Sequence, residues 1–225
     1  MKALEYLNAN LLENVRISSL RHIHEYILNN DVKRVIEFGT SRVNFEGNST
    51  IFLALLAKEK KAKFTSIDIN QNNIDNAKSI MESFDADLLD YVEFICKDQY
   101  VYMNEYDQIP SQYVYLDCDD NQKHKSLDAL LKSNILDNKA LICIDDMITQ
   151  DYGCQIQVEG VVDIVNQNSK FLTPLTRNDS HLSLNHEQIK WNSLNETFPQ
   201  SKNNCLVYEK GIRQFEYQIL LEYSK

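Results

Sequence analysis

Three short apolar runs, each closed by glycine or aspartate, constrain the fold of this 225-residue chain more than any other feature. They cover residues 35–39 (VIEFG), 113–117 (YVYLD) and 140–146 (ALICIDD). Continuous apolar runs of this length are typical of parallel β-strands that are covered on both faces. Ligands of open α/β sheets bind at the carboxyl ends of the strands. We therefore expect the acids at these ends to face a ligand.

The charge and composition exclude several classes of partner. The chain has 23 basic and 33 acidic residues and a formal net charge of -10, whereas nucleic-acid binding needs a basic face. No apolar run reaches membrane-spanning length, and the N-terminus lacks the apolar core of a signal peptide. The five cysteines show no CxxC spacing, which favours reduced thiols. We expect a cytoplasmic protein whose partner is a small molecule, without nucleic-acid or membrane contacts.

Strand patterns and helix patterns alternate along most of the chain. Apolar residues at helical spacing predict helices within residues 1–30 and again after the first, second, fourth and fifth expected strands. The expected strands are residues 32–38, 64–67, 91–96, 113–117 and 140–146.

The C-terminal part adds an antiparallel element. Residues 205–208 have strand character, residues 210–211 form a turn, and apolar residues alternate strictly over 215–223. This pattern predicts an antiparallel hairpin at the sheet edge. The whole order predicts an α/β fold, a Rossmann-like doubly wound sheet of seven mostly parallel strands with a C-terminal antiparallel hairpin. No linker divides the chain, so we expect residues 1–225 to form a single domain.

With this order of elements, the chain resembles class I S-adenosylmethionine (SAM)-dependent methyltransferases. Glu37-Phe38-Gly39 matches the family's acid-x-Gly end of the first strand, where a residue without side-chain bulk lets the methionine part of SAM approach. Asp68 matches the acid after the second strand, which would accept hydrogen bonds from the ribose hydroxyls. Asp98 matches the acid after the third strand, near the adenine. The resemblance thus implies a cofactor site made of Glu37, Gly39, Thr40, Ser41, Asp68, Ile69, Asp98 and Asp117.

Each of these residues could also have an ordinary structural role. Glu37 and Gly39 could end a strand in any nucleotide-binding fold. Asp68 would equally suit ribose recognition in an NAD enzyme, although the dinucleotide fingerprint Gly-x-Gly-x-x-Gly is absent. Asp98 could simply cap a loop. The ordered combination of these acids with Asp117 is more specific than any one of them.

The loop after the first strand departs from the family pattern. Family members commonly read Gly-x-Gly-x-Gly, whereas this chain reads GTSR over residues 39–42 and next has glycine at Gly47. Residues 47–50 (GNST) resemble the Gly-Gly-Ser-Thr helix start of macrocin O-methyltransferase-like and cephalosporin-hydroxylase-like proteins. The longer loop implies a cofactor pocket of a different shape.

A second resemblance is to catechol- and caffeoyl-CoA-type O-methyltransferases, which bind a divalent cation near the methyl donor. Asp117 matches the aspartate that closes their fourth strand, and Asp145-Asp146 matches the pair that closes their fifth. Carboxylate oxygens suit Mg²⁺ or a similar hard cation. The cation would bind the acceptor hydroxyl and lower its pKa, which also makes Asp117 a catalytic candidate. The alternative is that these acids face solvent at strand ends.

The sequence leaves the general base open. The catechol-type enzymes have a lysine three residues after the first aspartate, and the macrocin-like proteins tend to have a histidine there. This chain has Asp120 at that position, with Lys123 and His124 about one turn later. His181 and His186, in a polar segment nearer the C-terminus, are the other candidates, because neutral imidazole accepts a proton near pH 7.

That polar segment, residues 176–204, is asparagine-rich, lacks clear periodicity and is long for a connection inside a compact domain. Long connections of this kind are often functional, so we expect a lid over the acceptor site. Trp191 offers a flat apolar surface on which a sugar or an aromatic acceptor could pack. A disordered surface insertion is the alternative.

Two functions follow from these patterns. The first is SAM-dependent, metal-assisted O-methylation of a small hydroxylated molecule, such as a sugar or a specialised metabolite. The second is a methyltransferase fold without methyl transfer, as in a cephalosporin-hydroxylase-like enzyme or a cofactor-binding module. A protein with either function could act as a homodimer.

Overall fold

A seven-stranded sheet forms the centre of the protein in a computed structural model, which describes residues 2–10, 15–40, 48–118, 122–148, 152–174, 206–208, 211–213 and 216–225. The strand order is β3-β2-β1-β4-β5-β9-β6. Strands β1 to β5 run parallel, and β9 runs antiparallel to both of its neighbours. The strands span Arg34–Phe38 (β1), Lys63–Asp68 (β2), Val92–Cys96 (β3), Ser111–Leu116 (β4), Leu136–Ile148 (β5), Leu172–Pro174 (β6) and Glu216–Ser224 (β9).

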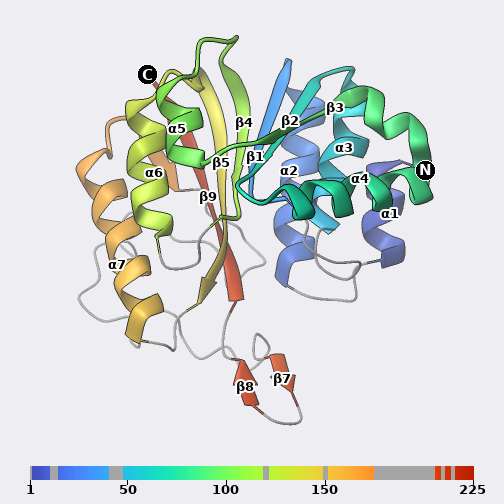
Figure 1. Cartoon of the computed structure of the whole chain (residues 1–225). Coiled ribbons are helices and arrows are strands. Elements are labelled where there is room, and N and C mark those ends of the chain that lie inside the picture. The colour runs from blue at the N-terminus through green and yellow to red at the C-terminus, as the bar shows by residue number, and fades with distance from the viewer. Residues whose placement is uncertain are drawn as a thin grey trace.

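Helices cover both faces of this sheet, with α1 to α4 on one side and α5 to α7 on the other (Figure 1). A short 3₁₀ helix, Ala86–Tyr91, leads from α4 into β3. The helices span Ala3–Asn10 (α1), Val15–Asn29 (α2), Asn48–Lys60 (α3), Gln71–Asp85 (α4), Gln99–Asn104 (α5), Lys123–Lys132 (α6) and Tyr152–Gln167 (α7).

Successive strand residues alternate between two buried clusters, one on each face of the sheet. On β4, Tyr113 and Tyr115 pack with α1, α2 and α3, whereas Val114 and Leu116 pack with α5, α6 and α7. Successive side chains of a strand point to opposite faces, so a strand that is covered on both sides must be apolar throughout. This accounts for the continuous apolar runs of the sequence.

The predicted fold class is confirmed: the protein is α/β, with a Rossmann-like doubly wound and mostly parallel sheet of seven strands. The order β3-β2-β1-β4-β5 is the one expected for a doubly wound sheet. Helices α1 and α2 confirm the helices expected within residues 1–30. Four described elements were not predicted: the short helix α5, the 3₁₀ helix Ala86–Tyr91, and the three-residue strands β6 and β8 (Gly211–Arg213).

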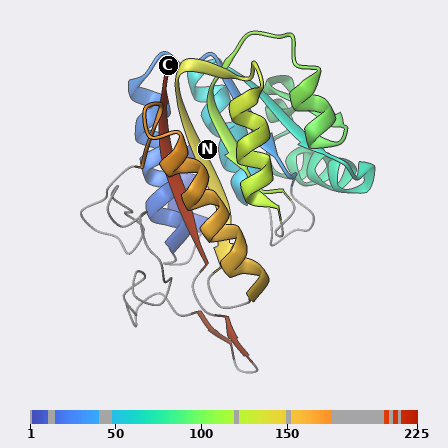
Figure 2. The same cartoon turned by 90° about the vertical axis from the view of Figure 1, so that its left-hand side faces the viewer.

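The C-terminal strands pair differently from the predicted hairpin. Strand β9 lies in the sheet between β5 and β6 (Figure 2). Residues 205–208 were expected to be its partner, but β7 (Leu206–Tyr208) pairs with β8 (Gly211–Arg213) in a separate two-stranded sheet. The edge of β9 is instead occupied by β6, through Leu172, Thr173 and Pro174. Among the described residues, no helix is both long and apolar enough to cross a membrane.

Candidate active site

The carboxyl ends of β1, β2 and β4 are joined by backbone hydrogen bonds. The Gly39 N–H donates to the carbonyl of Ile67 at 2.8 Å, and the Asp117 N–H donates to the carbonyl of Phe38 at 2.8 Å. Gly39 has a φ of +95°, and a Cβ added there would lie 2.1 Å from the carbonyl oxygen of Asp117. Glycine is therefore required by the protein's own backbone, in addition to the predicted need for space near SAM.

Glu37 lies near the end of β1 and is fully buried. Its Oε2 accepts hydrogen bonds from Thr50 Oγ1 at 2.9 Å and from Ser66 Oγ at 2.7 Å. Thr40 Oγ1 lies 2.7 Å from Ser66 Oγ. Since a serine hydroxyl has one proton and Ser66 donates it to Glu37, Thr40 is the donor in this second bond. Thus one chain of hydroxyls links the predicted residues Glu37 and Thr40.

Burial is the main influence on the Glu37 carboxyl. Loss of hydration raises its pKa from 4.5 to about 7, and the nearby charge of Asp68 acts in the same direction. Hydroxyl groups of Ser66, Thr50 and Ser49 oppose this rise, because they donate to the ionised form. The carboxyl therefore gains or loses its proton close to neutral pH.

Asp68 ends β2 and is tied to the same network. Its Oδ2 accepts the Thr40 N–H at 3.0 Å, and its Oδ1 accepts the Asn70 N–H at 2.7 Å. The side-chain amide of Asn73 bridges both oxygens at 3.1 and 3.2 Å. These bonds fix the carboxylate at the strand end where a ribose was predicted to bind. The next residue, Ile69, is 70% exposed and so presents an apolar side chain at this edge.

Asp98 follows β3 and begins α5. Its Oδ1 accepts the N–H groups of Tyr100 at 2.9 Å and Val101 at 3.1 Å, which makes it the N-cap of the helix. The Lys97 N–H donates to the Asp68 carbonyl at 2.9 Å and holds this strand end against β2. Asp98 thus has the capping role that was the alternative to ligand binding, and its contact with adenine stays a prediction.

Asp117 follows β4 and forms an ion pair with Lys123. The distance from Asp117 Oδ1 to Lys123 Nζ is 3.6 Å, and the side chains are 24% and 0% exposed, respectively. Lys123 begins α6, which packs on the face that carries Val114 and Leu116. In the sequence, Lys123 lies beyond the expected position of the base, and the fold brings it back to the aspartate.

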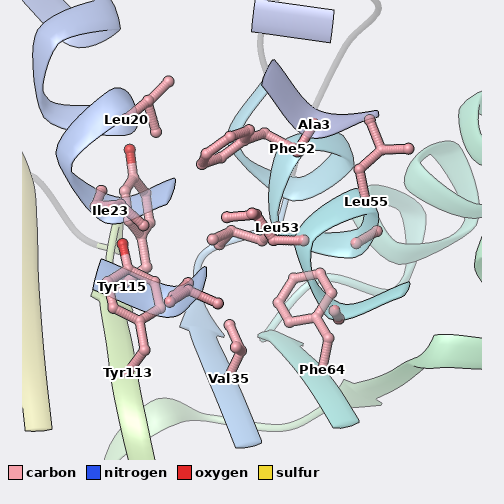
Figure 3. Packing of buried hydrophobic residues seen from close by; sticks show 14 of the residues in the cluster. Ala3, Leu20, Ile23, Val35, Phe52, Leu53, Leu55, Phe64, Tyr113 and Tyr115 are labelled. Carbon is pink, nitrogen blue, oxygen red and sulfur yellow. The ribbon is translucent and has the colours of Figure 1, made fainter. Parts of the chain in front are cut away.

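Asp145 lies on β5 and is 1% exposed. The hydroxyl of Tyr115 donates to its Oδ2 at 2.5 Å. Tyr115 and Tyr113 stand side by side on β4 beneath Leu20 and Ile23 of α2 (Figure 3). This is the sheet face opposite to α6.

Two of the three residues in the predicted metal set, Asp117 and Asp145, have described side chains, and each has a protein partner. Leu116 pairs with Ile144, so Asp117 and Asp145 follow each other in register. Lys123 forms an ion pair with Asp117, and Tyr115 donates a hydrogen bond to Asp145. The side chain of Asp146 is not described, so the metal site stays a prediction. Within the described residues, no three His, Cys, Asp or Glu side chains gather as a metal site.

Several predicted residues lie outside the described part of the chain. These are Ser41 in the glycine loop, Asp120, the histidines His181 and His186, Trp191 and the expected lid 176–204. The backbone of Asp146 belongs to β5, but its side chain is not described. Their roles stay predictions.

Two buried residues of the site, Ser66 and Tyr115, did not stand out in the sequence. Alternation along the strands could have found both of them. Ser66 lies two residues before Asp68, and Tyr115 lies two residues before Asp117, so each shares a strand face with a predicted acid. Lys123 was noted in the sequence as lying about one turn beyond the expected base, but its ion pair with Asp117 depends on how α6 packs against the sheet.

The comparison with known families agrees with this architecture. Residues 36–147, about half of the chain, match the family described as Methyltransferase domain. This part of the chain belongs to that family, and the predicted identification as a class I SAM-dependent methyltransferase is confirmed at the level of the family. The chain matches no curated protein sequence.

Solved structures share the fold at low sequence identity. Cofactor-bound Rv0187 from MTB is 16% identical, with a TM-score of 0.61, and the match covers 98% of this chain and 87% of that one. The O-methyltransferase from Bacillus cereus in complex with SAH is 14% identical, with a TM-score of 0.59 and coverage of 99% and 90%. The O-methyltransferase TomG from Streptomyces achromogenes, in complex with SAM, is also 14% identical, with a TM-score of 0.59 and coverage of 100% and 90%. At these identities the likeness concerns the fold.

Proposed function

We propose that the protein is a SAM-dependent O-methyltransferase that acts on a small hydroxylated molecule, such as a sugar or a specialised metabolite. The observation that carries this proposal is the bonded edge made by Glu37, Gly39, Thr40 and Asp68 within the methyltransferase domain. The fixed acids and the tight glycine turn sit at the carboxyl ends of adjacent strands, where doubly wound sheets bind their ligands.

Each side chain of this edge has a role in binding SAM under the proposal. Asp68 would accept hydrogen bonds from the ribose hydroxyls, for which the Asn73 amide at 3.1 Å must yield or share the carboxylate. Ile69 would give the adenine ring an apolar surface, with Asp98 nearby. Glu37 would lie below the cationic methionine part, and Ser41 would contact it from the loop.

The chemistry needs a deprotonated acceptor oxygen. Bound SAM supplies a methyl group on a sulfonium, and the acceptor oxygen forms a bond to this carbon as the carbon–sulfur bond breaks. Asp117 follows β4 and is 24% exposed, and under the proposal it would orient the acceptor hydroxyl. The proton goes to a general base, for which the sequence leaves His181 and His186 as candidates.

Metal assistance is a separate part of the proposal. The order of Asp117, Asp145 and Asp146 at two neighbouring strand ends supports a Mg²⁺ or similar site. The partners that Lys123 and Tyr115 give to the first two aspartates speak against it. Chelator added to the transfer assay separates these alternatives, because a metal-assisted enzyme loses activity and recovers it with Mg²⁺ or Mn²⁺.

The experiment that tests the function is an acceptor screen with methyl-labelled SAM. We expect label in a small hydroxylated acceptor, and loss of that label when Asp117 is changed to alanine. Binding of SAM without transfer to any oxygen, nitrogen or carbon acceptor would favour the second function, a methyltransferase fold without methyl transfer. Absence of SAM binding would contradict both.

A further inference from the structure

The two oxygens of the buried Glu37 carboxyl have different surroundings. Oε2 accepts hydrogen bonds from Thr50 at 2.9 Å and from Ser66 at 2.7 Å. Oε1 is buried and has no hydrogen-bond partner among the residues that the structure describes. The hydroxyl of Ser49 also favours the charged form, but it does not reach Oε1 with the geometry of a hydrogen bond. A full negative charge here would lose hydration that the protein replaces at one oxygen only.

The charged and titratable groups around Glu37 on this face of the sheet are acids. On β2, β4 and β5 they are Asp68, Tyr113, Tyr115, Cys143 and Asp145. The helices above add the hydroxyls of Ser49 and Thr50 from α3 and apolar side chains of α2 such as Leu20 (Figure 3). No basic side chain of the described residues forms an ion pair with Glu37. The carboxyl therefore lacks a counter-charge within this part of the protein.

A carboxyl in such surroundings keeps its proton more tightly than one in water. Loss of hydration raises the pKa of Glu37 to about 7, and the like charge of Asp68 adds to the rise. A cation beside the carboxyl would act in the opposite direction, because it favours the charged form. The methionine part of SAM has such a cation, its ammonium group.

We propose that Glu37 carries a proton in the free protein and releases it to the solvent when the ammonium group of SAM binds, so that cofactor binding is coupled to pH. The inference rests on the proposed function, which places the methionine part of SAM above Glu37. The O–H bond of the carboxyl breaks, its electron pair stays on the carboxylate, and the carboxylate pairs with the ammonium. Affinity for the cofactor should then rise with pH up to the pKa of Glu37 in the free protein and level off above it.

The test is calorimetry of SAH binding to the full chain in buffers with different heats of ionisation, which counts the protons released for each ligand bound. SAH has the same ammonium group as SAM. Since the pKa of Glu37 in the free protein is about 7, the unchanged protein should release about 0.9 proton at pH 6 and about 0.1 at pH 8. Its affinity for SAH should rise about tenfold between these two pH values.

A variant and a second ligand serve as controls. Glu37→Gln keeps the shape of the side chain and does not titrate, so its proton release at pH 6 should be lower by nearly the whole amount. Protons exchanged by other groups are common to both proteins and cancel in this difference. The ligand 5′-methylthioadenosine keeps the nucleoside and lacks the ammonium group, so its binding to the unchanged protein should release far less than SAH does.

The outcomes separate this inference from the proposed function. SAH binding with the same proton release in the unchanged protein and in Glu37→Gln would overturn the inference and leave the function intact. Equal proton release with SAH and with 5′-methylthioadenosine would overturn it as well, and this comparison decides the matter if Glu37→Gln fails to fold. Absence of SAH binding to the unchanged protein at both pH values would contradict the inference and the function together.

Discussion

The buried carboxyl of Glu37 should make the stability of the protein depend on pH in a defined direction. Its pKa is about 7 in the folded protein, against 4.5 for the ordinary group. The folded state therefore holds the proton more tightly than the unfolded state. The resulting stabilisation is fully present below pH 4.5 and is lost as pH rises through 7. Between pH 5 and pH 8 the loss amounts to about 2–3 kcal/mol.

The variant Glu37→Gln isolates this effect. Glutamine keeps the shape of the side chain, and its carbonyl oxygen can still accept from Thr50 and Ser66, but it does not titrate. Urea unfolding of both proteins at pH 5, 6, 7 and 8 gives the difference in free energy of unfolding, in which other titrating groups cancel. The unchanged protein should lose about 2–3 kcal/mol relative to the variant over this range. Two parallel curves would refute the buried, proton-holding state of Glu37.

Three further changes test the packing of the site by urea unfolding. Gly39→Ala should lower the free energy of unfolding by about 3 kcal/mol or more, because the new Cβ would meet the Asp117 carbonyl and the backbone has a positive φ. A loss no larger than that of an ordinary surface substitution would contradict the close approach of Gly39 to Asp117. Asp117→Asn should destabilise the folded protein by about 2–3 kcal/mol, because it removes the carboxylate charge beside the buried ammonium of Lys123. Adding Lys123→Met should restore part of that loss. Strictly additive costs of the two changes would argue against the ion pair. Tyr115→Phe should cost about 1–3 kcal/mol, since Asp145 Oδ2 loses its donor; an unchanged midpoint would show that this hydrogen bond contributes nothing.

The parallel strands could be predicted from the sequence because they are buried on both faces. In runs such as residues 113–117 every position is apolar until the acid at the end, and a strand covered on both sides is the structure that this pattern favours. The strand β6 could not be found, since three residues contain too little pattern to distinguish a strand from a loop. The pairing of β7 with β8 depends on which edges are already occupied, which the local sequence does not contain.

The acids of the candidate site that lie at strand ends could be predicted from the sequence. The side chains that bond to these acids could not. Asp68 and Asp117 end strands as expected, and parallel topology brings them to one edge. The ion pair of Asp117 with Lys123 arises from the packing of α6 against the sheet. The resemblance predicts a cation for these aspartates, which stays a prediction, and the structure adds a lysine beside Asp117 and a tyrosine bonded to Asp145.

The most direct test of the account is calorimetric titration of SAH into the unchanged protein, Asp68→Ala and the control Asp90→Ala. Asp90 is an exposed aspartate in the 3₁₀ helix after α4, and its loss should leave binding intact. We expect one SAH per chain for the unchanged protein and a loss of about 1–3 kcal/mol in binding free energy for Asp68→Ala, since the ribose hydroxyls lose a charged acceptor. No binding to the unchanged protein, or equal affinity for the Asp68 and Asp90 variants, would contradict the placement of SAM at the carboxyl ends of β1 and β2.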